Sequence, residues 1–548
     1  MLKGLMMDYP LTLQHFVDRA TRLYGKKEIV TKIGASMHRY NYGEWGKRVG
    51  KLANALKRLG VERGDRVGTL AWNNYRHFEA YFAIPCMGAV LHTLNLRLPL
   101  DQLAYIINHA EDKVIIVDAT QAPINCVTLL EKIKDKLTTV KHFVVMGDAS
   151  QTTLSPAHGY EELIAGEPDS FAWPPLDENE AAAMCYTSGT TGNPKGSLYS
   201  HRAIFLHSMG EGMTNVFGLS EKDVVLPVVP MFHANACGLP FTATMVGAKQ
   251  VFPGPHLTGP DLLNLIQSEK VTIPAGVPTI WMGILAELEK NPDKYDVSSI
   301  RLMPVGGSAA PRAMIEAYQK KYGVTILHAW GMTEMTPLGT TSRLKSYMED
   351  WPEEKRFEVR AKQGIPSAGV EIRAVDENGD EVPWDGKTMG ELEVRGPWII
   401  SAYYKMEGGQ DRFHDGWFRT GDVVTIDPEG YINITDRTKD LVKSGGEWIS
   451  SIDLENAIMA HPKVLEAAVI ALPHPRWQER PLALVVEKPD HKGNVTKEEI
   501  YDLIRDKFNK MWLPDDIVFI DAVPKTSVGK FDKKVLREQF KEYQLPGM

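Results

Sequence analysis

Hydrophobic and polar positions alternate along the first 430 residues with the two periods that distinguish helices from strands. Residues 11–25 carry apolar side chains at helical spacing and end at Gly25, which predicts a helix. Residues 113–119 and 141–148 are short β-branched runs of the kind found in buried strands. Residues 261–285 read as helix, strand, turn and helix. This alternation predicts an α/β fold with largely parallel sheets.

The pattern changes near residue 390. Residues 390–404 and 416–437 contain short strand patterns separated by turn signals such as DG, GD and PEG. They predict a small β-rich, barrel-like part. The remaining tail predicts, in order, a helix at 452–460, strands at 465–472 and 482–487, and a helix at 496–510.

The polar, glycine-containing stretch at 436–451 separates these two regions and predicts a domain boundary. We expect a large N-terminal domain of residues 1–437, built from several subdomains with parallel-rich sheets. We expect residues 438–548 to form a small, mobile α+β C-terminal domain.

Composition and charge exclude several classes of protein. The chain has 548 residues, of which 43% are hydrophobic and 24% charged, with a formal net charge of −8. This charge argues against nucleic acid as a main partner and against an electrostatic membrane anchor. The four cysteines form no CxxC pair, so we expect neither a zinc site nor a disulfide framework. We also see no signal peptide, and the apolar stretch 80–96 is interrupted by Pro85, His92 and Asn95. A cytoplasmic protein is expected.

The stretch YTSGTTGNPKG at 186–196 is the first candidate for chemistry. It follows the apolar run 181–185 and combines glycines, which allow main-chain N–H groups to face an anion, with hydroxyls and one lysine. Such a loop suits a polyphosphate, although it is not a Walker A motif. Taken alone, a loop of this composition is more often a solvated turn.

Five further motifs accompany this loop. They are WGMTE at 330–334, RTGD at 419–422, DRTKD at 436–440, KSGGEWISS at 443–451 and PKTSVGK at 524–530. In this order they resemble the adenylate-forming superfamily of acyl-CoA synthetases, nonribosomal adenylation domains and firefly luciferases. The resemblance covers essentially the whole chain and is strongest to bacterial medium- and long-chain fatty-acid–CoA ligases and to 3-(methylthio)propanoate–CoA ligases.

The resemblance implies an ATP-dependent ligase that joins a carboxylic acid to CoA through acyl-AMP, with ATP, Mg²⁺ and CoA as cofactor and co-substrates. Thr187 and Glu334 would hold Mg²⁺, Trp330 would stack on adenine, and Asp422 and Arg437 would reach the ribose. The implied nucleotide-binding residues are Thr187, Ser188, Gly189, Thr190, Thr191, Gly192, Lys195, Gly306, Gly307, Ser308, His328, Ala329, Trp330, Gly331, Met332, Thr333, Asp422, Arg437 and Lys530.

The same resemblance assigns the catalytic steps. Lys530 would contact the substrate carboxylate and the phosphate that it attacks, where a cation offsets the repulsion between two anions. The implied catalytic residues are Lys530, Thr187, Glu334 and His233. The C-terminal domain would then rotate about a hinge at Lys439 to present a CoA-facing segment. That segment consists of Lys443, Ser444, Gly445, Gly446, Glu447 and Trp448.

The segment PMFHANACGLPF at 230–241 matches the acyl pocket of the family, with lining residues His233, Ala234, Cys237 and Gly238. No acidic residue lies between 225 and 260 to pair with an amine, which disfavours an amino-acid substrate. Many relatives carry a tryptophan in place of Cys237 and a larger residue in place of Ala234, and Ser197 replaces an expected valine. These changes predict a more open acyl channel.

Several alternatives remain for the function. The acid is expected to be a medium- or long-chain fatty acid; 3-(methylthio)propanoate or another short, branched or aryl acid is the alternative. A ligase for a carrier protein would share the first half-reaction, a luciferase-like oxygenase would share the fold, and an inactive nucleotide-binding scaffold would lack both reactions. No nucleic-acid partner and no transmembrane segment are expected. A homodimer is left open, because fatty-acid relatives often dimerise through the N-terminal domain.

Overall fold

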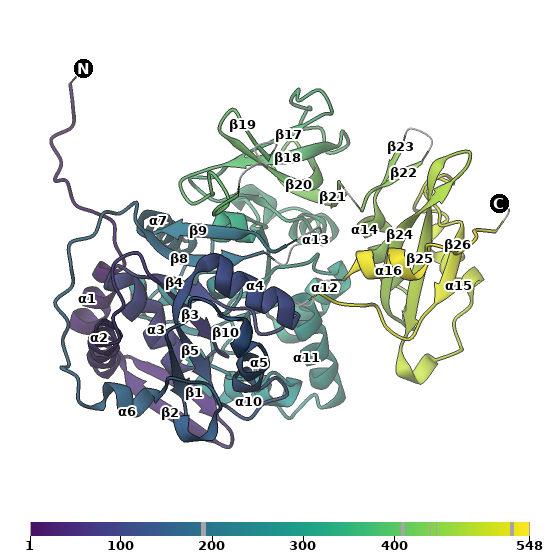
Figure 1. Ribbon diagram of the computed structural model, residues 1–548. Coiled ribbons are helices and arrows are strands. Elements are labelled where there is room, and N and C mark those ends of the chain that lie inside the picture. Colours follow the sequence, from purple (N-terminus) through teal and green to yellow (C-terminus); the bar gives the residue numbers. More distant parts are fainter. Residues whose placement is uncertain are drawn as a thin grey trace.

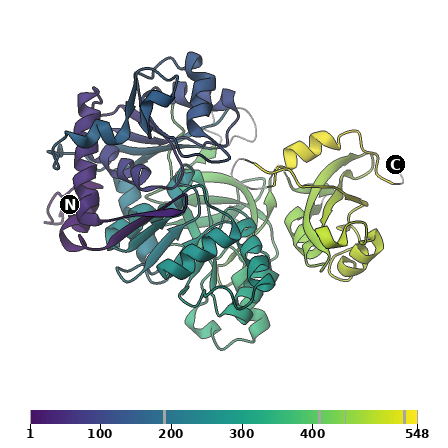
Figure 2. The ribbon, with the colours of Figure 1, turned by 90° about the horizontal axis from the view of Figure 1, so that it is seen from below.

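The computed structural model describes residues 2–187, 193–406, 412–438, 440–444, 447–526 and 531–546, with Glu447 described by its backbone alone. A large body of mixed helices and sheets is followed by a smaller part that stands beside it (Figures 1 and 2). The predicted α/β class with parallel-rich sheets is confirmed.

A seven-stranded sheet forms one layer of the body, and all of its strands are parallel except the last pair. The β-branched run at 113–119 is its β5, in which residues 114–117 are fully buried, as expected for a strand covered on both faces. In spatial order the strands are β7 (Ala157–Gly159), β6 (His142–Met146), β5 (Asp112–Asp118), β3 (Arg66–Leu70), β4 (Val90–Thr93), β8 (Ala181–Tyr186) and β9 (Gly196–Ser200).

A second, five-stranded sheet is parallel except for the hairpin at its edge. Its strands are β12 (Ile273–Ala275), β10 (Val224–Pro227), β11 (Lys249–Phe252), β1 (Glu28–Ile33) and β2 (Ser36–Asn41). The predicted order of helix, strand, turn and helix in 261–285 is confirmed, since α10 and α11 flank β12.

Helices cover these sheets, and the predicted first helix is confirmed, although it is shorter at both ends than 11–25. The helices of the body are α1 (Gln14–Leu23), α2 (Tyr42–Arg58), α3 (Tyr75–Cys86), α4 (Leu100–Ala110), α5 (Cys126–Ile133), α6 (Tyr160–Ala165), α7 (His201–Gly212), α8 (Ala234–Cys237), α9 (Leu239–Val246), α10 (Gly259–Glu269), α11 (Pro278–Lys290), α12 (Arg312–Tyr322) and α13 (Glu353–Ala361). The stretch 80–96 is a buried helix followed by a strand, as predicted.

Two smaller sheets carry the motifs WGMTE, RTGD and DRTKD. The first is formed by β13 (Met303–Val305), β14 (Ile326–Gly331), β15 (Leu338–Thr341) and β16 (Ile365–Pro366). The second is fully antiparallel and confirms the predicted β-rich part. It contains β17 (Glu371–Val375), β18 (Gly390–Arg395), β19 (Phe413–His414), β20 (Trp417–Ile426) and β21 (Ile432–Arg437).

The C-terminal part has hydrophobic cores of its own, and every residue of these cores lies beyond residue 440. Its elements are β22 (Val442–Ser444), β23 (Glu447–Ile449), α14 (Ser451–Met459), β24 (Val464–His474), β25 (Gln478–Glu487), α15 (Lys497–Ile504), β26 (Asp516–Phe519) and α16 (Lys533–Gln539). The helix predicted at 496–510 ends at Ile504, because the chain turns so that the stacked rings of Phe508 and Trp512 pack against this core.

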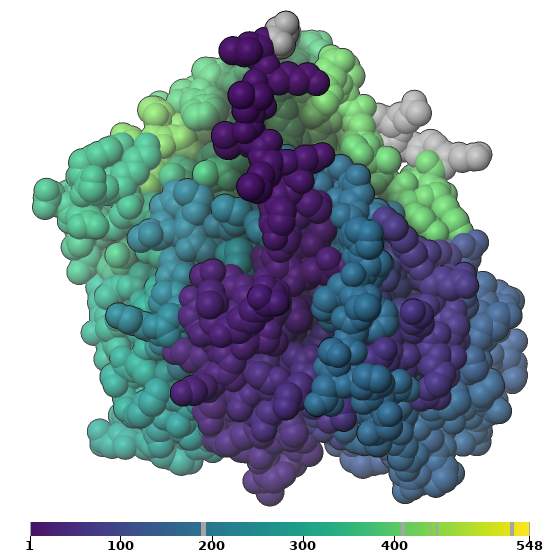
Figure 3. Space-filling model, turned by 90° about the vertical axis from the view of Figure 1, so that its left-hand side faces the viewer, coloured from purple at the N-terminus to yellow at the C-terminus, as the bar shows by residue number. Residues whose placement is uncertain are grey.

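The first residues of the chain extend away from the body (Figure 3). Leu2, Leu5, Met6 and Met7 are almost fully exposed, which is unusual for four large apolar side chains within six residues. Within the part of the chain that is described, no helix combines the length and the apolar character needed to cross a bilayer.

Candidate active site

The glycine-rich stretch 186–196 connects an antiparallel pair at the edge of the seven-stranded sheet. The Thr187 N–H donates to the Lys195 carbonyl at 2.9 Å, and the Lys195 N–H donates to Thr187 Oγ1 at 3.3 Å. The two ends of the candidate phosphate loop are therefore held together by the sheet. The predicted phosphate-binding residues Ser188, Gly189, Thr190, Thr191 and Gly192 lie outside the described residues.

A tyrosine connects this hairpin to the predicted magnesium ligand Glu334. The Lys195 ammonium lies 4.9 Å from the ring centroid of Tyr403, whose hydroxyl donates to Glu334 Oε1 at 2.7 Å. Burial and the nearby Glu334 carboxylate raise the pKa of Tyr403, so its hydroxyl remains a donor. Lys195 and Glu334, which are 139 positions apart in the sequence, thus share one polar cluster.

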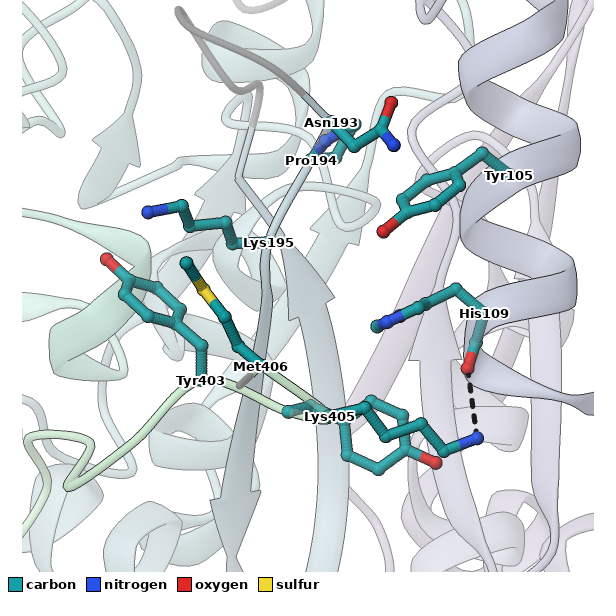
Figure 4. Close-up of a pocket in the computed structure, with 9 residues that line it drawn as sticks. Tyr105, His109, Asn193, Pro194, Lys195, Tyr403, Lys405 and Met406 are labelled. Atoms are coloured by element: carbon teal, nitrogen blue, oxygen red, sulfur yellow. Dashed lines mark hydrogen bonds between the residues drawn. The ribbon is translucent and has the colours of Figure 1, made fainter. Parts of the chain in front are cut away.

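A pocket of about 290 Å³ adjoins this cluster between α4 and the hairpin (Figure 4). The side chain of Lys195 points toward Tyr403, whereas Tyr105 and His109 of α4 form the opposite wall. The Tyr186 hydroxyl lies 2.7 Å from His109 Nδ1, and burial lowers the pKa of His109. Asn193, Pro194 and Lys195, at the described end of the candidate phosphate loop, therefore line this pocket.

Strand β14 brings the motif WGMTE into the same region. Its residues Ala329, Trp330 and Gly331 pair with β15, with a register shift between Trp330 and Gly331. A Cβ on Gly331 would lie 2.1 Å from the Pro337 carbonyl oxygen, so only glycine fits there. Met332 and Thr333 follow, and the Tyr199 hydroxyl donates to the Thr333 carbonyl at 2.5 Å.

The predicted adenine-side residues surround the end of β13. A Cβ on Gly306 would lie 2.9 Å from the Ala329 carbonyl oxygen, so the turn formed by residues 305–308 lies against β14. Gly307 has φ +87°, and Ser308 follows it. His328 is buried, and its ring nitrogens engage the main chain at Ala310 and Ala361. Burial lowers its pKa to about 4, so His328 is a neutral anchor of this turn.

The predicted ribose ligands lie together with Trp330. The Trp330 indole donates from Nε1 to Asp422 Oδ2 at 2.9 Å, and Arg437 Nε lies 3.3 Å from Asp422 Oδ1. Asp422 and Arg437 are direct partners in the β20–β21 ladder. Trp330 lies 92 positions before Asp422 in the sequence, and Arg437 lies 15 positions after it. Residues of three motifs therefore meet at the buried Asp422 carboxylate.

The predicted acyl segment contains a left-handed helical turn. Ala234, Asn235, Ala236 and Cys237 have φ between +42° and +59°, and Gly238 continues the turn at +76°. This conformation costs roughly 1–2 kcal/mol for each non-glycine residue and persists only where the surroundings impose it. Asn235 Oδ1 accepts hydrogen bonds from Thr93 and Cys185, which tie the turn to the seven-stranded sheet. His233 immediately precedes the turn, at its N-cap position, and is partly exposed.

Gly238 lies against a buried polar pair on α7. A Cβ on Gly238 would lie 2.6 Å from the ring of His207 and 3.7 Å from Glu211 Oε2, which also accepts from Thr242. Burial lowers the pKa of His207 to about 3, so the ring is neutral near neutral pH. Burial raises the pKa of Glu211 to about 8. The segment predicted to line the acyl pocket thus adjoins two uncharged polar side chains.

Replacing Glu211 by glutamine is expected to stabilise the protein increasingly as the pH rises from 4.5 to about 8. The folded chain retains a proton on Glu211 over this range, whereas the unfolded chain releases it. The wild type therefore loses about 1.4 kcal/mol of folding free energy per pH unit, a loss that glutamine avoids. Urea unfolding of both proteins near pH 5 and near pH 8 tests this. A difference in unfolding free energy that does not change with pH would contradict it.

The predicted CoA-facing segment lies in the C-terminal sheet. The Lys443 ammonium lies 5.6 Å from the ring centroid of Trp448, and Arg480 donates to Ser444 Oγ at 3.1 Å. The predicted hinge Lys439, the glycines Gly445 and Gly446, the side chain of Glu447 and the catalytic candidate Lys530 lie outside the described residues. Their roles stay predictions.

Two tyrosines of the site were missed by the sequence analysis. Tyr403 holds Glu334 and faces Lys195, and Tyr199 holds the main chain at Thr333. Neither lies in one of the six motifs. Tyr403 comes from an apolar stretch whose spacing predicts only short strands, and the contacts with Lys195 and Glu334 form only in the tertiary structure.

Two family models match the chain. One, described as AMP-binding enzyme, matches residues 17–404, and the other, described as AMP-binding enzyme C-terminal domain, matches residues 453–530. Among curated proteins, the 3-methylmercaptopropionyl-CoA ligase of Ruegeria lacuscaerulensis is 46% identical over 98% of this chain and 99% of its own length. The long-chain-fatty-acid–CoA ligase of Thermus thermophilus is 49% identical over 98% of this chain and 97% of its own length.

Solved structures show the same architecture. The anthranilate CoA ligase AuaEII in complex with anthranoyl-AMP has a TM-score of 0.86 at 26% identity, with 98% of each chain covered. ATP-bound MatB from Rhodopseudomonas palustris has a TM-score of 0.81 at 26% identity, covering 97% of this chain and 99% of its own.

Proposed function

The chain belongs to the AMP-binding enzyme family, and from this membership we propose that it is an ATP-dependent acyl-CoA ligase. It forms acyl-AMP and pyrophosphate from a carboxylic acid, and then the CoA thioester with release of AMP. The structural observation that carries the proposal is that one motif, WGMTE, joins both parts of the site: Trp330 contacts Asp422, and Glu334 is linked through Tyr403 to the hairpin of the candidate phosphate loop. Relatives that are named as CoA ligases and that each cover 98% of this chain support the proposal.

The nucleotide would be held at three places. The loop between Thr187 and Lys195 would bind the β- and γ-phosphates, and the turn at Gly306, Gly307 and Ser308 would border the adenine. His328 supports the chain that follows this turn, because its two ring nitrogens contact the main chain at Ala310 and Ala361. Asp422 would accept hydrogen bonds from the ribose hydroxyls, because a carboxylate offers acceptors only.

Mg²⁺ would fit the oxygen donors that Thr187 and Glu334 offer. Thr187 supplies a hydroxyl and Glu334 a buried carboxylate, and Mg²⁺ commonly takes one or two such oxygens together with substrate phosphates. When bound, the ion would neutralise charge on the phosphates. Tyr403 orients the Glu334 carboxylate through one oxygen, Oε1.

Replacing Tyr403 by phenylalanine is expected to raise the KM for ATP-Mg²⁺ about tenfold. The substitution removes the only hydroxyl that the described residues offer to Glu334, and a hydrogen bond to a charged group contributes about 1.5–3 kcal/mol. Tyr404→Phe is the matched control, because the Tyr404 ring faces His109 instead. Steady-state kinetics with varied Mg²⁺ measure the effect, and an unchanged KM in Tyr403→Phe would rule out this orienting role.

We propose that the boundary between the two domains lies at 437/438 and that Lys439 is the hinge. Two of the contacts across this point hold α14 to β21: Ser450 donates to the Thr435 carbonyl, and the Ser451 N–H donates to Asp436 Oδ2 at 2.8 Å. Rotation about Lys439 would break these contacts, withdraw Lys530 after adenylation and present the segment from Lys443 to Trp448 to the same site. No nucleophilic side chain is required, since the CoA thiolate attacks the acyl carbonyl directly.

The acid is proposed to be a medium- or long-chain fatty acid, lying along His233, Ala234, Cys237 and Gly238. Each methylene buried there would contribute about 0.8 kcal/mol. The strain in this turn supports a functional role, because strained backbone clusters at ligand sites. The alternative, a methylthio, short, branched or aryl acid, is supported by the relatives named for 3-methylmercaptopropionate.

The proposal is tested by pyrophosphate release with ATP, Mg²⁺ and carboxylic acids from propanoate to palmitate, including aryl and methylthio acids, each with and without CoA. Turnover that requires CoA is the expected result, and the best acid identifies the substrate class. A single equivalent of pyrophosphate regardless of CoA would indicate a carrier protein as the thiol acceptor. No release with any acid would contradict the ligase proposal.

We further propose a homodimer in which the exposed segment of residues 2–7 contacts the partner subunit. Four apolar side chains in water provide the driving force. Replacing Leu2, Leu5, Met6 and Met7 by serine is expected to shift the mass measured by light scattering from dimer to monomer. A monomeric wild type would contradict the proposal.

A further inference from the structure

Both oxygens of the Asp422 carboxylate are engaged by donors from other strands. Trp330 of β14 donates to Oδ2 at 2.9 Å, and Arg437 of β21 lies 3.3 Å from Oδ1. A carboxylate has about four acceptor positions, two on each oxygen. With the contacts that the described residues make, one position on each oxygen remains, which matches the two hydroxyls of a ribose.

The position of the Trp330 ring is fixed by the sheet around it. Trp330 is 8% exposed and pairs with Thr340 in the β14–β15 ladder. The ring packs on Gly339, where a Cβ would lie only 2.6 Å from it. Because the ring cannot shift toward β15, the direction of its N–H is set by the N-terminal body and not by the ligand.

The two anchors of Asp422 differ in burial and in location. The Arg437 side chain is 42% exposed, so water screens its attraction to the buried Asp422 carboxylate. Arg437 also lies two positions before the proposed hinge Lys439, whereas Trp330 lies within the body. A buried, charge-assisted hydrogen bond is the stronger of the two. The contact with Trp330 therefore holds Asp422 independently of the hinge.

We infer that Trp330 is a positioning residue for ribose recognition: its indole N–H holds the Asp422 carboxylate in the orientation that receives the 2′- and 3′-hydroxyls. This inference rests on the proposed nucleotide site. Stacking on adenine requires only an aromatic face, which phenylalanine also has. Positioning Asp422 for the ribose requires the indole N–H. We therefore expect the preference for a nucleotide with both ribose hydroxyls to depend on this N–H group.

The test removes the N–H and keeps the bicyclic ring. In the first variant, Trp330 is replaced by 3-benzothienylalanine, in which sulfur takes the place of the N–H group. In a second variant it is replaced by phenylalanine, which keeps only an aromatic face. Calorimetry measures the Kd for AMP and for 2′,3′-dideoxy-AMP, which offers Asp422 no hydroxyl. With the benzothienyl ring, we expect AMP affinity to fall about 10- to 100-fold, the range of a hydrogen bond to a charged group. Affinity for the dideoxy nucleotide should change less than about threefold.

Two controls separate positioning from a structural effect. Trp398 is also buried and donates from Nε1 to the Leu338 carbonyl at 3.0 Å, so the same ring exchange there should leave the ratio of the two affinities unchanged. In an Asp422→Asn background, the exchange at Trp330 should no longer discriminate between the nucleotides. A change at Trp330 that weakens both nucleotides equally, or neither, would overturn the inference. A wild type that binds neither nucleotide would instead contradict the proposed function.

Discussion

Replacing Lys530 by alanine is expected to slow acyl-AMP formation by about 10²–10³-fold, the size of effect found when a single electrostatic donor is removed from an active site. In that step a carboxylate approaches a phosphate, and a cation in a site closed to water offsets their repulsion. Affinity for ATP should change little, because the phosphate loop and Asp422 would hold the nucleotide. Pyrophosphate release in a single turnover measures the effect.

A neighbouring lysine provides the control. Lys525 precedes Lys530 by five positions and is paired with Glu466 at 2.5 Å, so Lys525→Ala should keep the wild-type rate of adenylation. Thioester formation from acyl-AMP supplied in solution should be nearly normal in Lys530→Ala, since the proposed hinge movement withdraws Lys530 from that step. Equal loss of both half-reactions would argue against separate domain orientations.

Replacing Arg48 by methionine is expected to lower the free energy of unfolding by about 3–5 kcal/mol. Arg48 of α2 pairs with Glu79 of α3 at 2.6 Å, and the Glu79 side chain is completely buried. Burial raises the pKa of Glu79, and removing Arg48 leaves its carboxyl with the hydroxyl of Tyr160 but without the cation that pairs with it. A buried charge without its partner is strongly destabilising.

Denaturant unfolding measures this loss. Arg22→Met is the matched control, because Arg22 and Asp18 form an ion pair of similar length, 2.6 Å, on the exposed face of α1. Exposed pairs contribute only about 0–1 kcal/mol. If the two variants lose the same stability, burial of Glu79 is not what makes the Arg48 contact important.

The sequence alone determined the fold class, several of the elements and the family. Apolar periodicity predicted β5, β12, α10, α11 and the β-rich part, because the side chains that face a core repeat with the period of the element that carries them. The resemblance in six motifs predicted the family, which the matching family models confirm. The end of α15 was missed because it depends on Phe508 and Trp512 packing against residues far away in the sequence.

Only the tertiary structure decided how the candidate site is held together. The motifs name Lys195, Glu334, Trp330 and Asp422, but no spacing shows that Tyr403 joins the first two or that an indole N–H joins the last two. The left-handed turn at Ala234–Cys237 is equally invisible in the sequence, since three of its four residues are alanine or cysteine, which disfavour that conformation. Local patterns report what each segment prefers, whereas these contacts and this strain arise from the packing of segments that are distant along the chain.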